Sequence, residues 1–531
     1  MEANISGQMP SSRTARRRWW TCLVAGCASG VLVALSLPPF GWWPAAWIGF
    51  GAVAFLLPGR RVGERAVIGA GLGLGQYGIG LLWVHEFSLP GCLALIALSS
   101  LYVAAALALV PTGRRRSVVI GMPSLLLLAD WARDRYPFGG MPIGGGSLGQ
   151  AVGPLAPTLR MGGSLLLTGE TVLVGVALAE LVHWVRGWRH LRSPWSSERP
   201  VKHALSKGAL AFVAVAAVAA AIPVAGCLSP SGEGGHVAAL RVALVQGGGP
   251  RGTRAITTDP QTVFQRDLVE SENLRPPLDL VVWPEGVLQS HVPFSGTEDA
   301  TDVADLAASL RTTLLVGVDQ DVGRGRYVNE MVAWGPNGKV VASYQKNHLV
   351  PFGEYVPFRW LLEKFFDLRD VPYDGIPGHG PGLISTPAGP LGVMISYEVF
   401  FDERARGAVR AGGQVLVVPT DTSSYRSTQV PTQEVAAARL RAWETGRWVL
   451  QVTPTGYTAV ISPVGKVVMR SALDQAQIIS ATIPMETGST WYVDLGDDPV
   501  AIAALLAGLL AWVLVRHDRS ARHHDRWSQR P

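Results

Sequence analysis

Long apolar segments dominate the first 230 residues of the chain, and one more lies near its C-terminus. A helix needs about 20 apolar residues to cross the hydrocarbon core of a bilayer. Segments near this length with few charged residues predict membrane spans rather than helices of a water-soluble core. The predicted spans are Trp19–Leu37, Trp42–Leu57, Ala66–Val84, Leu89–Val110, Val118–Trp131, Leu165–Val185, Ala209–Gly226 and Val500–Val515.

Arginine clusters alternate with connections that are not basic, such as Pro38–Gly41 and Glu86–Ser88. Clusters precede the first span and follow the second, fourth, sixth and eighth spans. Because cytoplasmic loops are enriched in Arg and Lys, this alternation predicts that both termini are cytoplasmic and that the segment after the seventh span lies outside. Two arginines, Arg133 and Arg135, fall on the predicted outer side, where Asp130 and Asp134 are expected to pair with them.

The basic residues of this chain lie between apolar segments. The 531 residues carry a net charge of +6. A nucleic-acid-binding protein would gather such residues on one folded face, so no nucleic-acid partner is expected. The cysteines lie in or at the end of apolar segments without C-x-x-C or Cys/His spacing, and no structural zinc site is predicted.

Three short motifs in the membrane half admit two interpretations each. The sequence V-A-G-C ending at Cys27 fits a lipoprotein cleavage site, but the apolar segment continues to Leu37, which favours a span. The G-x-G-x-x-G pattern of Gly73–Gly78 lies inside a span with no strand before it, so helix packing is favoured over nucleotide binding. The G-x-S-x-G pattern of Gly145–Gly149 lies in a glycine-rich loop, so a catalytic serine is not favoured there.

The segment from about Val237 to Thr490 has a different residue pattern from the apolar segments before it. Short β-rich runs alternate with longer helical segments. The predicted strands are LRVALVQG, LDLVVWPEG, TTLLVGV, MVAW, KVVASYQK, LGVMISYE, QVLVVPTD, WVLQVTP, YTAVISP, KVVMRS and QIISATI. Pro336-Asn337-Gly338 separates two of these runs and predicts a hairpin. An α/β domain with a largely buried sheet is therefore predicted, with helices at Asp302–Leu310, Asp402–Ala411 and Gln433–Gly446.

The predicted domain organisation follows from the spans and the α/β segment. Residues 1–18 form a basic cytoplasmic N-terminus, and residues 19–226 form a membrane domain with about seven helices. Residues 237–490 form the outer α/β domain. Residues 500–515 form a C-terminal span, and residues 516–531 form a cytoplasmic tail.

Polar residues end several of the predicted buried strands. Glu285 follows VVWP, Lys346 follows VVASYQ and Ser396 follows GVMI. Strand ends are where α/β folds assemble their sites. A carboxylate that removes a proton, a lysine that stabilises an oxyanion and a hydroxyl that attacks a carbonyl suit acyl transfer. An ordinary solvated or paired charge at each strand end is the alternative.

Four motifs resemble a known family. W-P-E-G at Trp283–Gly286, Y-Q-K-N-H-L-V-P-F-G-E-Y-V-P at Tyr344–Pro357, I-S-Y-E at Ile395–Glu398 and A-L-V-Q-G at Ala243–Gly247 resemble the nitrilase superfamily. The second motif and the arrangement of spans resemble its membrane branch, the apolipoprotein N-acyltransferases. This resemblance implies a polytopic α-helical membrane domain of about eight spans and an extracytoplasmic nitrilase-like αββα sandwich.

The resemblance also implies roles for individual residues. Glu285 matches the general base, Lys346 the oxyanion-stabilising lysine, and Glu354 a second active-site glutamate, while Tyr397 and Glu398 match the residues beside the nucleophile. The implied reaction moves an acyl chain from a phospholipid to the enzyme and then to the N-terminal diacylglyceryl-cysteine of lipoproteins. The implied location is the plasma (inner) membrane, and no metal or soluble cofactor is implied.

The sequence departs from the family at the nucleophile, because Ser396 stands where the family has cysteine. A hydroxyl is far less acidic than a thiol, so we expect impaired activity. The family's N-D-A-W-F-G is also replaced, by T-D-T-S-S-Y at Thr420–Tyr425. Two alternatives stay open: a non-catalytic homologue that binds lipoprotein or lipid, or partners an active paralogue, and an amidase acting on small amides.

Two apolar segments of the outer domain also admit two interpretations. Trp360, Leu361, Phe365 and Phe366, and the amphipathic helix predicted at Gln433–Gly446, could dip into the bilayer surface or belong to the core of the domain.

Overall fold

A computed structural model gives the structure of this protein. It describes residues 12–86, 88–113, 115–191, 198–234, 238–249, 258–365, 368–369, 371–422 and 429–527. The predictions that concern Phe366, residues 423–425 and the two ends of the chain beyond these ranges lie outside the described residues.

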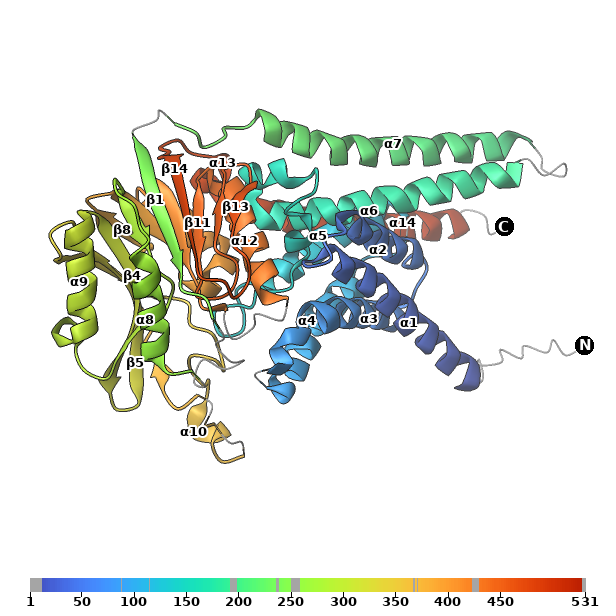
Figure 1. Ribbon diagram of the computed structural model, residues 1–531. Helices are drawn as coiled ribbons and strands as arrows, with labels where there is room; N and C mark the ends of the chain where they lie inside the picture. Colours follow the sequence, from blue (N-terminus) through green and yellow to red (C-terminus); the bar gives the residue numbers. More distant parts are fainter. Residues whose placement is uncertain are drawn as a thin grey trace, which may run out of the picture.

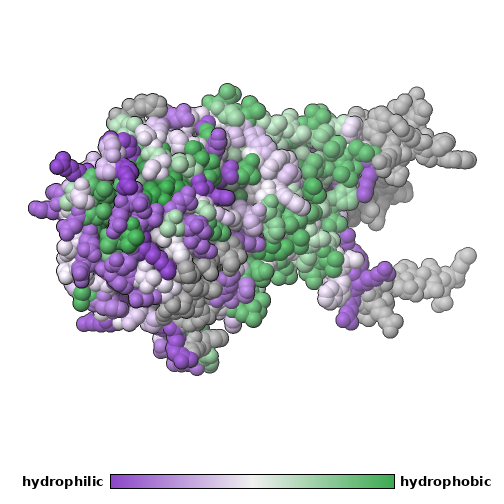
Figure 2. All heavy atoms as spheres, viewed as in Figure 1, coloured by the Kyte–Doolittle hydropathy of each residue, from purple (hydrophilic) through white to green (hydrophobic). Residues whose placement is uncertain are grey.

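Each predicted span coincides with a helix of the structure. The helices are α1 (Ser12–Ser36), α2 (Trp43–Leu56), α3 (Val62–Gly80), α4 (Leu89–Leu109), α5 (Arg115–Arg133), α6 (Leu159–Leu191), α7 (Glu198–Leu228) and α14 (Asp498–Trp527). Among the described residues, five helical segments, in α1, α4, α6, α7 and α14, are long and apolar enough to cross a membrane, and α2 is apolar but shorter. Figure 2 shows hydrophobic side chains gathered over this helical part. The chain is a multi-pass membrane protein.

Glycines set the close packing of α3 against its neighbours. A Cβ atom on Gly75 would lie 2.3 Å from the backbone oxygen of Cys27 in α1, and one on Gly73 would lie 2.5 Å from the Cα atom of Ser100 in α4. Only the hydrogen atom of a glycine fits at these positions. Small residues allow the backbones of membrane helices to approach closely in this way. The packing interpretation of this glycine motif is confirmed.

Two β-sheets face each other in the outer part of the molecule (Figure 1). The first has the order β14-β1-β2-β4-β5-β6 with β3 and β7 at its side, and the second has the order β13-β12-β11-β10-β9-β8. The strands are β1 (Ala239–Gln246), β2 (Leu280–Val282), β3 (Leu288–Ser290), β4 (Thr313–Gly323), β5 (Arg326–Trp334), β6 (Val340–Gln345), β7 (Asp374–Gly375), β8 (Leu383–Thr386), β9 (Gly389–Val393), β10 (Val415–Pro419), β11 (Val449–Val452), β12 (Ala459–Ile461), β13 (Val467–Arg470) and β14 (Gln477–Pro484).

Apolar side chains of both sheets fill the space between them. Val242 and Leu315 of the first sheet share one buried cluster with Val393 and Val417 of the second. Helices α8 (Pro260–Ser271) and α9 (Glu298–Leu310) cover the outer face of the first sheet through Phe264 and other apolar residues. Helices α11 (Asp402–Arg410) and α12 (Val430–Thr445) cover the second. The predicted αββα sandwich is therefore confirmed.

Helix α12 joins the sandwich to the helical domain. Its Gln433 side-chain amide donates a hydrogen bond to the Gly80 carbonyl at 3.0 Å. At its other end, Glu444 accepts hydrogen bonds from the backbone N–H and the hydroxyl of Ser164 at 2.9 and 2.7 Å. This helix is buried between the two domains, so the bilayer-surface interpretation is wrong for α12. Trp360 and Phe365 are instead 64% and 73% exposed.

Charged residues near the domain boundary pair largely as predicted. Arg133 lies 3.0 Å from Asp130 and 3.2 Å from Asp134. Arg135 instead pairs with Asp497, at 2.7 Å, just before α14. The sequence neighbourhood of Arg135 could not reveal this contact, because Asp497 is far along the chain.

Candidate active site

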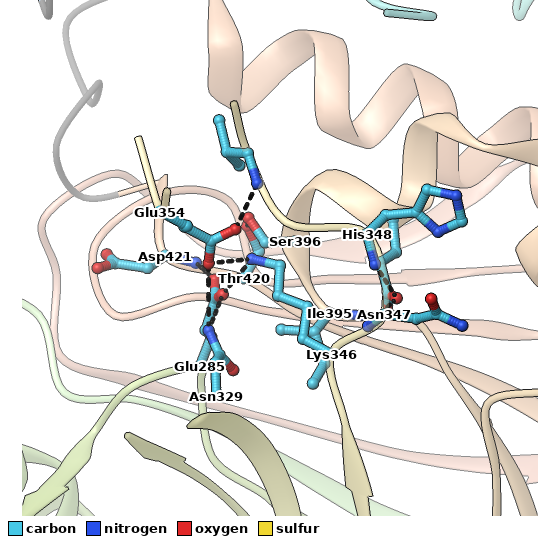
Figure 3. Close-up of polar contacts among 12 residues, drawn as sticks. Glu285, Asn329, Lys346, Asn347, His348, Glu354, Ile395, Ser396, Thr420 and Asp421 are labelled. Atoms are coloured by element: carbon cyan, nitrogen blue, oxygen red, sulfur yellow. Dashed lines mark hydrogen bonds and ion pairs between the residues drawn. The ribbon is translucent and has the colours of Figure 1, made fainter. Parts of the chain in front are cut away.

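Four strand ends of the two facing sheets bring the site together. Glu285 follows β2, Lys346 follows β6, Ser396 follows β9 and Thr420 follows β10. The Lys346 ammonium lies 2.8 Å from Glu285 Oε1 and 2.8 Å from Glu354 Oε1 (Figure 3). The structure therefore places one buried lysine between two carboxylates, as expected for a base and an oxyanion-stabilising cation that share a site.

Ser396 adopts a backbone conformation that side chains rarely take. Its φ is +49°, in the left-handed region, at the sharp turn between β9 and the 3-10 helix η6 (Ser396–Phe400). Such strain persists only where the surrounding structure holds it, and it is concentrated at functional sites. The turn leaves Ser396 partly exposed while its neighbours Ile395 and Tyr397 are buried.

Two consecutive residues link Ser396 to the charged cluster. The hydroxyl of Thr420 lies 3.3 Å from the Ser396 hydroxyl. The backbone N–H of the next residue, Asp421, donates a hydrogen bond to Glu285 Oε2 at 2.8 Å. Since these adjacent residues contact Ser396 and Glu285, the structure gathers Glu285, Lys346 and Ser396 in one site.

Hydrogen bonds fix both carboxylates. The Asn329 side-chain amide donates to Glu285 at 2.8 Å, and the Val350 backbone N–H donates to Glu354 at 2.7 Å. Burial alone would lower the pKa of Lys346, but Glu285 and Glu354 outweigh it and hold this pKa above its usual value. Burial raises the pKa of Glu354. Lys346 is therefore charged and suited to stabilise an oxyanion.

Sequence reasoning missed two members of this cluster. Asp319 lies in β4, and burial, followed by the charges of Glu285 and Glu354, raises its pKa to about 8. Its carboxyl group is therefore neutral at pH 7 and adds no further negative charge. Asn329 is a buried polar residue within the apolar strand β5. Both lie in or at the end of apolar runs, which is the same signal that identified Glu285 and Lys346.

Glu398 organises the backbone on both sides of the site. It accepts hydrogen bonds from the Tyr344 hydroxyl and from the backbone N–H groups of Asn347 and Ile395, each at 2.8 Å. It thereby ties the loop after Lys346 to the turn before Ser396. The resemblance placed Glu398 beside the nucleophile, and the geometry gives it a supporting position.

Tyr397 connects the site to the helical domain. Its hydroxyl donates a hydrogen bond to the Gly140 carbonyl at 3.1 Å, and its ring lies 5.0 Å from that of Phe401. Both rings belong to a cluster that includes apolar residues of the membrane helices. The turn that carries Ser396 is therefore anchored on the helical domain.

Replacing Glu398 by alanine should destabilise the protein and inactivate it. The change leaves the donors of Tyr344, Asn347 and Ile395 without their acceptor, and each unsatisfied buried group costs roughly 1–3 kcal/mol. We expect a lower unfolding temperature and an activity loss of at least about tenfold. The exposed Glu363→Ala is the matched control. An unchanged unfolding temperature for E398A would contradict this role.

Comparisons with known proteins agree with this arrangement. Residues 241–492 match the carbon-nitrogen hydrolase family, and residues 29–177 match the apolipoprotein N-acyltransferase N-terminal domain. Apolipoprotein N-acyltransferase of Azotobacter vinelandii is 30% identical, covering 95% of this chain and 97% of its own. That of Mycolicibacterium smegmatis is 29% identical, covering 96% and 86%. The solved structure of Saccharomyces cerevisiae Nit3, a nitrilase-superfamily member, is 21% identical, covering 47% of this chain and 91% of its own with a TM-score of 0.38.

The αββα sandwich and its buried Glu–Lys–Glu cluster define a carbon-nitrogen hydrolase domain, carried here on a membrane domain. The chain belongs to the apolipoprotein N-acyltransferase family, the membrane-bound acyltransferases of the nitrilase superfamily.

Proposed function

We propose that this protein transfers an acyl chain from a phospholipid to the α-amine of the N-terminal diacylglyceryl-cysteine of lipoproteins, through an acyl-enzyme on Ser396. The observation that carries the proposal is the intact charged cluster beside this serine. Three charged residues lie together with hydrogen-bond geometry: Glu285 and Lys346 are buried, and Glu354 is partly buried. Burying a charged group destabilises the fold unless the group is paired, and the charges of this cluster are paired. The cluster also lies at the strand ends where Ser396 is placed.

In the first half-reaction, the Ser396 oxygen attacks the ester carbonyl of the phospholipid. The serine proton passes to a carboxylate of the site as the new C–O bond forms, and Lys346 stabilises the negative charge on the carbonyl oxygen. The lysophospholipid leaves with a proton as the old ester bond breaks. In the second half-reaction, the lipoprotein amine attacks the Ser396 ester, an amide forms, and the serine regains its proton.

Both half-reactions are slower with serine than with cysteine. A hydroxyl needs its base during the attack, because it is not ionised beforehand as a thiol can be. An oxygen ester also reacts less readily with an amine than a thioester does. The proposal therefore includes a reduced rate relative to a cysteine nucleophile.

We further propose that the sandwich, residues 237–490, lies outside the cytoplasm and that both termini are cytoplasmic. Helix α1 begins and α14 ends at the end of the helical domain opposite the sandwich (Figure 1). Three of the basic connections meet at one place: Arg18 pairs with Glu64 at 2.8 Å, and Thr112 donates to the Arg60 carbonyl at 3.2 Å. Basic connections that share one end support that orientation under the positive-inside rule.

Trapping of the acyl-enzyme tests the proposed function. Purified protein incubated with phospholipid carrying a labelled acyl chain should acquire label at Ser396, as an oxygen ester that resists neutral hydroxylamine. Ser396→Ala should abolish the label. The control is Ser147→Ala, which removes the serine of the G-x-S-x-G pattern and should leave labelling intact. No label on the wild type, together with binding of a lipoprotein peptide, would favour the non-catalytic homologue instead.

A further inference from the structure

A further carboxylate, outside the Glu–Lys–Glu cluster, is connected to Ser396 through Thr420. Glu434 lies in the first half of α12, and its two oxygens are 2.9 and 2.8 Å from the Thr420 hydroxyl. That hydroxyl lies 3.3 Å from the hydroxyl of Ser396. Thr420 and Glu434 are almost fully buried, so water competes little for these contacts. The three side chains form one continuous path from the serine to the carboxyl group.

The path has a direction, because the Thr420 hydroxyl carries a single hydrogen. The geometry lets this hydrogen point either to Ser396 or to the Glu434 carboxylate. When it points to Glu434, a lone pair of the threonine oxygen is free to accept the proton of Ser396. The 3.3 Å separation is longer than an ideal hydroxyl pair, and catalytic hydrogen bonds commonly shorten once substrate is bound.

We propose that Thr420 and Glu434 form a proton relay that activates Ser396, with Thr420 as a catalytic residue and Glu434 as a positioning residue acting through it. This inference rests on the proposed function and specifies how a serine serves in a site whose relatives use cysteine.

The relay balances protons in both half-reactions. As the Ser396 oxygen bonds to the phospholipid carbonyl, its proton moves to the Thr420 oxygen, and the Thr420 proton moves to the Glu434 carboxylate. The lysophospholipid alkoxide then takes a proton back through the same path as its ester bond breaks. When the amine attacks the Ser396 ester, the amine proton passes through Thr420 to the Glu434 carboxylate, and the same path then returns this proton to the departing serine oxygen.

The oxygens of Glu285 are less available for this task. Lys346 and Asn329 donate to one of them and the Asp421 backbone N–H donates to the other. Glu434 forms no ion pair with a basic side chain in the part of the chain that the structure describes. Burial raises its pKa to about 8; the hydrogen bond from Thr420 and the charge of Lys346 oppose this rise, and the charges of Glu285 and Asp421 add to it. Its carboxylate is therefore a stronger base than an exposed glutamate.

The pH dependence of acyl-enzyme formation follows from this environment. The relay needs the Glu434 carboxylate, so the rate should rise with pH with a midpoint near the pKa of about 8. The charged groups that face Glu434 are Glu285, Lys346 and Asp421. The other charged groups of α12 are Arg439, whose pKa is lowered by burial, and Arg441, which pairs with Glu444. On the elements packed against α12, Glu398 pairs with Arg404, Asp402 interacts with the charge of Arg441, and Arg160 lies over the Trp443 ring.

Single-turnover labelling of the full-length protein between pH 6 and 9.5 tests the relay. Thr420→Val and Glu434→Gln should each slow acyl-enzyme formation by about 100-fold, and E434Q should lose the rise near pH 8. Thr420→Ser should restore most of the rate, because it keeps the hydroxyl. Thr422→Val is the matched control, since it removes another buried hydroxyl, one that contacts Thr453.

The same substitutions in a Ser396→Cys background separate a relay from a structural role. A thiol beside a cation does not need the relay, so T420V and E434Q should slow labelling there by less than about tenfold. Equal losses in both backgrounds would mean a structural role and overturn the relay. If T420V and E434Q are labelled as fast as the wild type, the relay is wrong, but the proposed acyl-enzyme on Ser396 is still supported. Absence of label on the wild type would overturn the proposed function and the relay with it.

Discussion

Replacing Ser396 by cysteine should accelerate acyl-enzyme formation by at least about 100-fold at neutral pH. The Lys346 ammonium already lies in the site, and a nearby cation lowers the pKa of a thiol and increases its thiolate fraction. The thioester formed is also a better acyl donor to an amine. Both half-reactions should therefore be faster. A 100-fold acceleration corresponds to a rate-limiting barrier that is lower by about 2.7 kcal/mol.

Labelling with radioactive or clickable phospholipid measures this gain directly. The label on S396C should be released by neutral hydroxylamine, whereas the label on the wild type should resist it. Ser147→Cys is the control, because it introduces a thiol into the same protein outside the site. If S396C labels no faster than the wild type, then the surrounding residues favour an oxygen nucleophile more strongly than a thiol, and the expected impairment by serine is wrong.

The sequence predicted most of the fold because its signals are local. Apolar segments of span length and short β-rich runs depend only on neighbouring residues, and each predicted span and strand has a counterpart in the structure. Strands β3, β7 and β8 were missed. β3 and β7 have three and two residues, and the four residues of β8 lack a sustained apolar pattern. β3 and β7 pair with β4 and β5 of the first sheet, and β8 pairs with β9 of the second, so these short strands depend on partners in the assembled sheets.

The site was predicted in part for the same reason. Residues at strand ends, such as Glu285 and Lys346, carry a local signal, and their contact follows from the way the sheets stack. Glu434 lies on a helix whose sequence gives no sign that its first half faces a strand end. The sequence pattern of α12 fits a helix at a bilayer surface and a helix buried between two domains equally well. The sequence alone therefore could not decide between these positions.

Replacing Lys346 by methionine should both inactivate and destabilise the protein. The side chain is 2% exposed and bonded to two carboxylates. Removing one partner of a buried ion pair costs roughly 3–5 kcal/mol, because the remaining charge stays buried without compensation. Loss of the oxyanion-stabilising cation should reduce acyl-enzyme formation by about 1,000-fold or more. Lys339→Met, in the exposed turn between β5 and β6, is the control for loss of a lysine.

A neutral version of the cluster separates these two effects. In the triple variant Lys346→Met, Glu285→Gln, Glu354→Gln, neither of the two carboxylates that paired with Lys346 is left charged, so the unfolding temperature should recover much of the loss seen with K346M. Activity should not recover, because neither a base nor a cation is present. Thermal unfolding followed by the loss of intrinsic tryptophan signal, alongside the labelling assay, measures both. Recovery of labelling in the triple variant would contradict the role of Lys346, since it would show that the lysine serves only to balance charge.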